Sequence, residues 1–567
     1  MKQGLQAART SAVQAACLIT LGAGVLAWQP ALAQKGAPAA PQSAPQAVPQ
    51  TKQGASDDAG SGGVGDPRRS RRQSVPEVDE PGVQRIGVGR ATSNERSLRI
   101  IPGFSVGYTA SDNIDLFPRE TREPGSLLEV SPFVEVKIRR PGSTVDLNAS
   151  VRGQKYWDSV FVDDRLDGDL SGTADVSISG DALRLRADGN VFRIDETGLG
   201  GTAVTGGART QNTTIFRSFN VSPYSVGRLG LNTQYEAGYE YELIDRGTRN
   251  DSNRVFGEIQ HTGFGDGRLG LLGRVDARQV EYENGSEYDN ISGLLGLSWA
   301  LSGRLKVGGG AYYSAIDALY DDGDNSGVGP AVYWDWRASE RSAFQGQVAD
   351  AYYGSNVAVR FRQLFQRWVF SANYNKGVED GNRASTFLFR PINAFRGSTR
   401  RTSDRTLNDF NASLAERDLE LGPGSQLFTA VLDSALVYDN TLSLSAAYIR
   451  PRHAGLVSLF SSDRDAATTP FGANSDRQIN QWGAYGVFDY LLSSRNSVRV
   501  IGQYRRASLQ DSGESSLFNG IDVSYKRTLT SRADVRFAVR YSIQDGDGGA
   551  SSYKETAGTV TYTYRYK

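Results

Sequence analysis

Residues 528–541 read TLTSRADVRFAVRY, and residues 489–506, DYLLSSRNSVRVIGQYRR, present the same features in the same order. Each stretch contains a hydroxyl-rich turn, an Arg, and then strict alternation of apolar and charged residues. In DVRFAVRYSI the two sets are Val535, Phe537, Val539, Tyr541 and Ile543 against Asp534, Arg536, Arg540 and Ser542. Successive side chains of a β-strand point to opposite faces. The stretch therefore predicts a strand with one apolar face and one strongly polar face.

The same period of two recurs along most of the chain. It is clear in TVDLNASVRGQKY at 144–156 and in LGLNTQYEAGYEYE at 229–242. A soluble sandwich would also alternate, but its strands are usually about five or six residues long, whereas these segments run for about ten to fourteen. No βαβ pattern supplies helices to cover a sheet. The pattern favours an all-β, transmembrane, antiparallel up-and-down β-barrel of about 24 strands, within a range of about 20–26.

An Arg recurs at the expected tight turns. These are Arg228, Arg268, Arg304, Arg341, Arg495 and Arg532. Successive intervals among the first four are 40, 36 and 37 residues, the length of a two-stranded unit with one short and one longer connection. Short turns of outer-membrane barrels face the periplasm. The Arg is then expected at the depth of the lipid headgroups; simple turn chemistry without a lipid role is the alternative.

The last segment, TAGTVTYTYRYK at 556–567, places Val560, Tyr562, Tyr564 and Tyr566 on one face. A closed barrel has no free edge, so its last strand must pair with its first. We expect this aromatic strand to close the barrel.

The start of the chain has a different composition. Lys2 and Arg9, an apolar run and Ala31-Leu32-Ala33 predict a signal peptide over 1–33, and a retained anchor helix is the less favoured alternative. Residues 34–96 are rich in Pro, Gly, Ala, Gln and Ser and predict a disordered periplasmic linker. The barrel is expected over 97–567. A basic cluster at 68–72 is expected to be a solvated part of the linker.

Composition excludes several classes of function. The chain has 567 residues, a mean hydropathy of −0.43 and 22% charged residues. Without the predicted signal peptide it carries 61 basic and 63 acidic residues, a net charge of −2, which gives no support for a nucleic-acid partner. The single cysteine, Cys17, lies in that signal, so we expect no disulfide or cysteinyl metal site in the rest.

Enzymatic motifs lack their structural context. GFSVG at 103–107 makes Ser105 a nominal nucleophile, but this motif needs a strand, a sharp turn and a helix, and here the strand continues. GDGRLG at 265–270 joins two strands, so it predicts a hairpin and not a nucleotide site. With only His261 and His453 available, and without EF-hand spacing among the acids, we expect no metal, cofactor or catalytic site.

The polar faces supply the candidate functional residues. We expect these charged side chains to line the pore: Arg152, Arg184, Arg186, Asp188, Glu236, Glu240, Arg274, Asp276, Arg278, Arg499, Arg505, Arg536 and Arg540. Mixed charges order water, and Arg forks bind hydroxyls and carboxylates. Tyr156 and Tyr282 are candidate stacking faces for sugar rings. The alternative is that the charges pair with one another and fill the interior.

Three phrases also carry a resemblance to a family. SVGYTASDNIDLFP at 105–118, SLLEVSPFVEV at 126–136 and the stretch 212–242 resemble the PEP-CTERM-system-associated outer-membrane proteins, which belong with the exopolysaccharide-linked β-barrel porins of type 2. The aromatic-Thr-Asp-Asn signature matches at Tyr108, Thr109, Asp112 and Asn113, with two residues lengthening the usual step. The resemblance implies an outer-membrane barrel associated with extracellular polysaccharide, and it supplies no catalytic residues.

Together these observations predict a non-enzymatic, water-filled conduit in the outer membrane for polysaccharide. Its expected partners are outer-membrane lipid, polysaccharide and periplasmic export components. The alternative is a non-conducting barrel that tethers exopolysaccharide or assembly partners at the cell surface.

Overall fold

A computed structural model describes most of the chain from Ser97 onward. The described residues are 97–566 apart from 119, 141, 158–164, 180–181, 196–212, 231, 246–248, 265–267, 284–286, 319–324, 340, 381–435, 467–478, 510–512 and 548–551. The predicted signal peptide and linker lie outside them. No described segment is a helix of sufficient length and apolarity to span a membrane.

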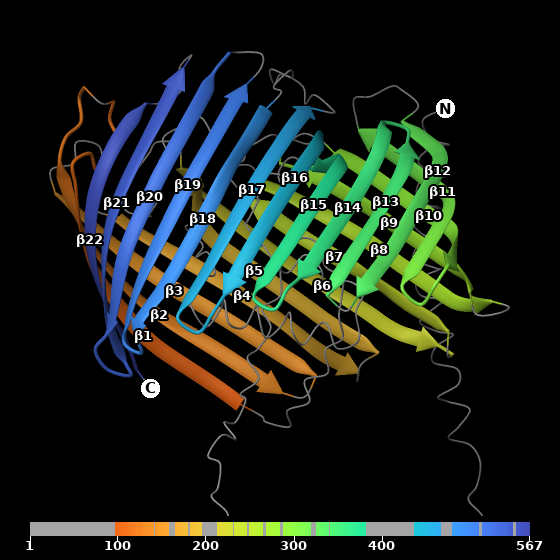
Figure 1. The fold of residues 1–567 in the computed structure, drawn as a ribbon, viewed down its shortest axis with the longest axis horizontal. Helices are drawn as coiled ribbons and strands as arrows, with labels where there is room; N and C mark the ends of the chain where they lie inside the picture. The colour runs from red at the N-terminus through yellow and green to blue at the C-terminus, as the bar shows by residue number, and fades with distance from the viewer. Residues whose placement is uncertain are drawn as a thin grey trace, which may run out of the picture.

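The described residues form one closed antiparallel barrel of 22 strands (Figure 1). Each strand pairs with the next along the chain, and β1 also pairs with β22, so Tyr108 lies opposite Val560 at the seam. The strands are β1 Ser97–Ser111, β2 Gly125–Arg140, β3 Ser143–Trp157, β4 Arg165–Ser179, β5 Leu183–Asp195, β6 Thr213–Leu229, β7 Thr233–Asp245, β8 Arg249–Phe264, β9 Leu269–Tyr282, β10 Glu287–Ala300, β11 Leu305–Ala318, β12 Ser326–Ser339, β13 Ser342–Ala351, β14 Gly354–Leu364, β15 Trp368–Asp380, β16 Leu436–Ile449, β17 His453–Ala466, β18 Ile479–Ser493, β19 Asn496–Leu509, β20 Ser515–Thr528, β21 Ala533–Asp547 and β22 Tyr553–Arg565.

The strand number lies within the expected range but is lower than the expected 24. The sequence did not resolve the strands around residues 355–425, and in the structure β15 and β16 are separated by residues 381–435. These two strands are direct neighbours from Trp368 opposite Tyr448 to Asp380 opposite Leu436. Residues 381–435 themselves lie outside the described residues.

Burial in this barrel is inverted relative to a soluble protein. Many large apolar side chains are exposed on the outer face, with Leu295 62% and Val539 61% exposed. Charged side chains on the opposite face of the same strands are buried, and Arg540 is 4% exposed. An apolar surface this extensive is stable only against hydrocarbon. The protein is an outer-membrane β-barrel whose outer face contacts lipid.

The connections differ between the two ends of the barrel. Those that follow even-numbered strands span two to four residues each, whereas the β15–β16 connection at the other end spans 381–435. We call the first end the short-turn rim. The carboxyl terminus lies at this rim (Figure 1), because the Arg565 amide donates to the Arg532 carbonyl at 2.8 Å.

A hydroxyl two residues before the Arg organises four of the short turns. The Ser or Thr oxygen accepts the Arg backbone N–H at 3.1–3.2 Å in the pairs Ser302 and Arg304, Ser339 and Arg341, Ser493 and Arg495, and Thr530 and Arg532. This local bond replaces a strand partner that the turn cannot supply. The repeated Ser–x–Arg phrase of the sequence is therefore a turn motif.

Arg228 does not belong to this series. It lies within β6, opposite Gln234 of β7, and the turn follows it at Gly230, whose φ is +71°. The expectation that the SVGR phrase is a turn equivalent to the others is wrong, because the left-handed backbone that closes the turn needs the glycine two residues later.

Candidate functional site on the inner wall

The predicted pore-lining residues all lie on the face opposite the exposed apolar side chains. On β21, for example, Phe537 and Val539 are 49% and 61% exposed, whereas Arg540 between β20 and β22 is buried. Strand alternation places the other candidates in the same way. The inner wall is therefore the charged surface of this molecule, and the contacts among its side chains define what it can do.

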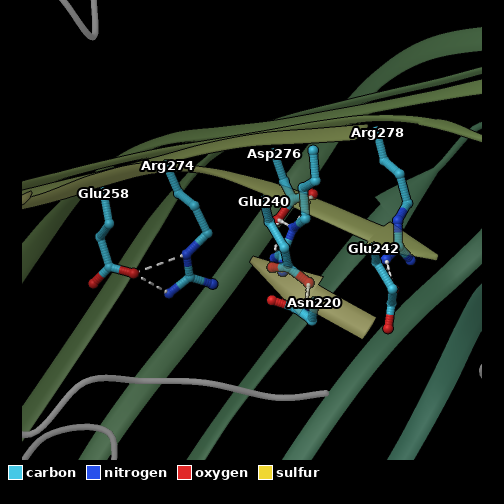
Figure 2. Close-up of polar contacts among 8 residues, drawn as sticks. Asn220, Glu240, Glu242, Glu258, Arg274, Asp276 and Arg278 are labelled. Atoms are coloured by element: carbon cyan, nitrogen blue, oxygen red, sulfur yellow. Dashed lines mark hydrogen bonds and ion pairs between the residues drawn. The ribbon is translucent and has the colours of Figure 1, made fainter. Parts of the chain in front are cut away.

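Strands β7, β8 and β9 carry a ladder of ion pairs (Figure 2). Arg274 binds Glu258 at 2.9 Å, and Arg278 binds Glu242 at 3.0 Å. Between them Arg254 contacts both Asp276 and Glu240, the latter at 3.2 Å. Glu240 also accepts a hydrogen bond of 2.8 Å from the Asn220 amide of β6. The ladder thus joins four neighbouring strands through their side chains.

The pairing register alone would oppose like charges in this ladder. Glu236 lies directly opposite Glu258, and Arg254 lies directly opposite Arg278. Like charges placed directly across a sheet are destabilising. The register also places Arg254 opposite Glu240 and Arg274 opposite Glu258. Arg254 and Arg278 reach diagonal carboxylates as well, those of Asp276 and Glu242. The Arg278–Glu242 pair crosses β8 beside Ser252, whose small side chain leaves the path open.

A second group of pairs surrounds the barrel seam. Arg499 binds Asp489 at 3.5 Å, Arg536 binds Asp522 at 3.5 Å, and Arg540 binds Glu555 at 2.8 Å. Arg505 lies over the Phe518 ring, 5.9 Å from its centroid. Four predicted residues therefore interact with residues of adjacent strands in β18–β22.

The third group joins β2 through β6. Arg152 contacts Asp169 at 2.7 Å and Glu129 at 3.6 Å. Asp175 receives both Arg184 at 2.7 Å and Arg186 at 3.9 Å, and the Tyr224 hydroxyl donates to it at 3.2 Å. The Arg186 guanidinium also lies over the Tyr224 ring at 5.3 Å. One partly buried carboxylate thus contacts two arginines and a phenol.

Sequence reasoning missed most of the partners. Arg254, Glu258, Asp175, Asp522 and Glu555 complete the pairs, yet none was singled out. The signal was present, because each lies at a polar position of an alternating strand. The alternation of polar and apolar residues does not give the register of the strands. The register decides which polar positions meet across neighbouring strands.

Two tyrosines that were expected to offer their ring faces to sugars are buried instead. Tyr156 is 9% exposed and donates its hydroxyl to Gln154 at 3.2 Å. Tyr282 is 4% exposed and contacts the Tyr288 ring at a centroid distance of 6.2 Å. Ser105 lies in the middle of β1, opposite Ser131 and Thr563. Ser105 therefore has strand neighbours on both sides and no strand-to-helix elbow.

A different aromatic group lies at the opposite end from the short-turn rim. Tyr352 and Tyr353 form the two-residue β13–β14 connection and are half-buried, with their rings edge to face at 5.2 Å. The Asn356 amide donates to the hydroxyls of Tyr353 at 2.8 Å and Tyr312 at 3.2 Å. Burial raises the pKa of Tyr353, followed in importance by the neighbouring Tyr312. We call Tyr312, Tyr352, Tyr353 and Asn356 the tyrosine–amide patch; it is a neutral surface.

Comparisons with known proteins give structural likenesses at low identity and identify no family. No family model matches the chain, and no curated protein matches its sequence. Among solved structures it is similar to the FrpB iron transporter from Neisseria meningitidis, at 11% identity over 82% of each chain with a TM-score of 0.45. It is also similar to the siderophore receptor PirA from Pseudomonas aeruginosa, at 11% identity over 83% of this chain and 80% of that one, with a TM-score of 0.36. The copper transporter OprC aligns at 8% identity over 84% and 81%, with a TM-score of 0.38.

The chain is a closed barrel of 22 strands with an apolar outer face. Its inner wall is polar, and ion pairs of opposite charge join its neighbouring strands. Such a wall holds water and hydrogen-bonding solutes without a strong field of one sign.

Proposed function

We propose that the barrel is a passive, water-filled conduit across the outer membrane for polysaccharide or its fragments. The observation that carries the proposal is the closed 22-stranded wall with an apolar outer face and a charged inner face. Barrels of this size enclose more space than their own wall side chains fill, so the lumen holds either water or a plug. The thirteen predicted inner-wall residues, from Arg152 to Arg540, are the proposed pore lining.

The paired state of the lining charges favours a neutral, hydrated cargo. In pairs such as Arg278–Glu242 and Arg274–Glu258 each charge is matched at 3.0 Å or less. The net field along the wall is then small, while unused N–H groups and oxygen lone pairs remain able to meet hydroxyls. A polyhydroxylated chain can exchange hydrogen bonds with such a wall without being held by a strong charge.

The choice of polysaccharide rests on two supports. The phrases at 105–118 and 212–242 resemble outer-membrane proteins of exopolysaccharide systems. The tyrosine–amide patch supplies half-buried rings beside an amide, a combination of apolar faces and hydrogen-bonding groups that suits sugars. We therefore place the first or last sugar contact at Tyr352 and Tyr353.

The proposed partners differ between the outer face of the barrel and its short-turn rim. Lipid surrounds the outer face, and periplasmic export components would meet the short-turn rim, where residues 34–96 would extend as a linker. The conduit needs no cofactor and performs no chemistry.

A structural, non-conducting barrel is the second candidate. Low exposure of some wall pairs favours it, since Arg540 and Glu555 side chains are 4% and 2% exposed. A pair this deeply buried is held by its own contact and not by water or cargo. Such a barrel would tether exopolysaccharide or assembly partners at the surface.

Planar-bilayer conductance separates the two candidates. Purified protein spanning 34–567 is compared with protein spanning 97–567. A large ohmic conductance in either form supports the conduit, and a larger conductance after deletion identifies the linker as a gate. If both forms insert correctly and neither conducts, the result supports the structural barrel and rejects the conduit.

The cargo is tested in the conducting form by adding neutral oligosaccharides. We expect them to block current transiently, and we expect the double variant Tyr352→Ala and Tyr353→Ala to shorten the blocks. Tyr313→Ala is the matched control, because Tyr313 neighbours Tyr312 but is 40% exposed on the outer face. Equal block by the double variant and the wild type would reject the sugar contact at the patch.

A further inference from the structure

Seven successive short turns carry an Arg at the same position. The residue immediately before each odd-numbered strand from β9 to β21 is an arginine. These residues form what we call the arginine collar: Arg268, Arg304, Arg341, Arg367, Arg452, Arg495 and Arg532. The equivalent positions before β3, β5 and β7 are Gly142, Ala182 and Asn232. The collar is therefore a continuous arc along the rim from β8 to β21.

The backbone of each collar residue has a structural role. Its carbonyl accepts the N–H of a residue at the end of the next hairpin, at distances of 2.7–3.1 Å. The donors, in the same order, are Ala300, Arg337, Leu364, Ile449, Leu491, Thr528 and Arg565. The same bond is made by Asn232, which accepts from Thr262 at 2.9 Å, and by Gly142, which accepts from Ser177 at 3.2 Å. The bond thus does not require an arginine side chain.

The guanidinium groups therefore need an explanation outside turn geometry. All seven collar residues are exposed. Among the described residues, the one collar side-chain contact that the structure shows is Arg304 donating to the Ala338 carbonyl at 3.0 Å. A long, charged side chain repeated at seven exposed positions indicates a common external ligand of negative charge.

An aromatic belt locates the membrane surface at this rim. Trp299, Trp336 and Trp368 are 56%, 46% and 43% exposed on the outer face, each within four residues of a short turn. From β15 to β18 the rings lie next to one another. The distance between ring centroids is 4.5 Å for Trp368 and Tyr448, 5.5 Å for Tyr448 and His453, and 6.3 Å for His453 and Tyr490. Tyr and Trp belts of barrels lie at the level of the lipid headgroups.

We propose that the arginine collar binds the phosphates of anionic phospholipids in the membrane leaflet at the short-turn rim. The collar begins where the aromatic belt ends, so its guanidinium groups lie at the depth of the phosphates. Arginine binds phosphate oxygens with two parallel N–H bonds while its stem stays on apolar surface. Because β2–β7 lack collar residues, the retained lipids surround the β8–β21 side of the barrel.

The test uses the full-length mature protein in mixed phosphatidylglycerol and phosphatidylcholine bilayers. After extraction, native mass spectrometry counts the lipids of each kind that remain bound. One Arg near an anionic surface contributes on the order of a fivefold preference. We expect phosphatidylglycerol to be enriched in the wild type, and we expect the fourfold variant R304Q, R341Q, R495Q and R532Q to lose at least about fivefold of that enrichment.

The matched control removes four exposed basic residues near the other rim. The variant R122Q, K155Q, R217Q and R506Q changes the net charge equally and should keep the enrichment. Equal retention by the wild type and the collar variant overturns the proposal. Loss in both variants overturns it too, because net charge would then explain the preference. If the collar variant does not fold, absence of any phosphatidylglycerol preference in the wild type still overturns it.

Discussion

Arg540 of β21 donates to Glu555 of β22 at 2.8 Å, and the same carboxylate accepts the Ser111 hydroxyl of β1 at 3.0 Å. Glu555 thus contacts both strands that flank β22, across the line where the last strand meets the first. Glu555 also accepts a hydrogen bond of 3.3 Å from the Ser542 hydroxyl of β21. Backbone pairing closes the barrel, and this buried carboxylate joins the seam through side chains.

Replacing Glu555 by Gln should weaken the seam. The change removes the Glu555 charge from its contact with the buried Arg540 guanidinium, and breaking a buried ion pair costs about 3–5 kcal/mol. Equilibrium unfolding in urea, followed by tryptophan fluorescence in lipid vesicles, measures the loss. Asp245→Asn is the control, because its partner Arg217 is 56% exposed and such pairs contribute about 0–1 kcal/mol. Equal losses from the two changes would contradict the assigned role of Glu555.

A charge on the outer face should cost free energy according to depth. Leu295 lies within β10 and is 62% exposed, whereas Leu301 lies in the next short turn and is 54% exposed. Leu295→Arg should destabilise the folded barrel by about 2–4 kcal/mol and Leu301→Arg by about 0–1 kcal/mol. The measurement is again urea unfolding in vesicles.

The two exposures are similar, so a soluble protein would tolerate both substitutions. A small effect at Leu295 would contradict its placement against hydrocarbon. A large effect at Leu301 would contradict the position of the rim at the membrane surface.

Removing carboxylates from the β7–β9 ladder should change ion selectivity if these side chains meet permeating ions. The double change Glu240→Gln and Glu258→Gln removes two negative charges from the ladder: Arg254 keeps Asp276 as a partner, and Arg274 loses Glu258. We expect the anion-to-cation permeability ratio to rise by at least about twofold. The reversal potential in a salt gradient across a planar bilayer measures it.

The reciprocal change, Arg254→Gln and Arg274→Gln, should lower the same ratio. Unchanged selectivity in both variants would place the ladder away from the ion path.

Period two predicted the faces of the strands, including the outward Val539 and the inward Arg540. It also predicted the closing strand and the difference between short and long connections. Both follow from local alternation and turn residues, which a sequence displays directly. The strand number, 22, falls within the expected range of 20–26 and below the expected 24, because alternation did not resolve the strands around residues 355–425.

The contacts of the inner wall could not be predicted in the same way. Arg278 and Glu242 are on β9 and β7, and they meet because Ser252 of the strand between them is small. That contact depends on the register of three strands, which alternation alone leaves open. Similarly, Arg228 shares its local phrase with the turn arginines, but the turn forms at Gly230.

The central claim is that apolar faces meet hydrocarbon while charged faces enclose water. The most direct test is a nitroxide scan of β21 in the mature protein, which is cysteine-free if the predicted signal containing Cys17 is removed. Single cysteines at 536–541 are labelled in vesicles, and collisions with oxygen and with a water-soluble relaxation agent are measured. We predict that labels at Phe537, Val539 and Tyr541 collide with oxygen, and that labels at Arg536 and Ala538 collide more with the aqueous agent. Aqueous collisions at Phe537 and Val539, or the same values at every position, would contradict the account.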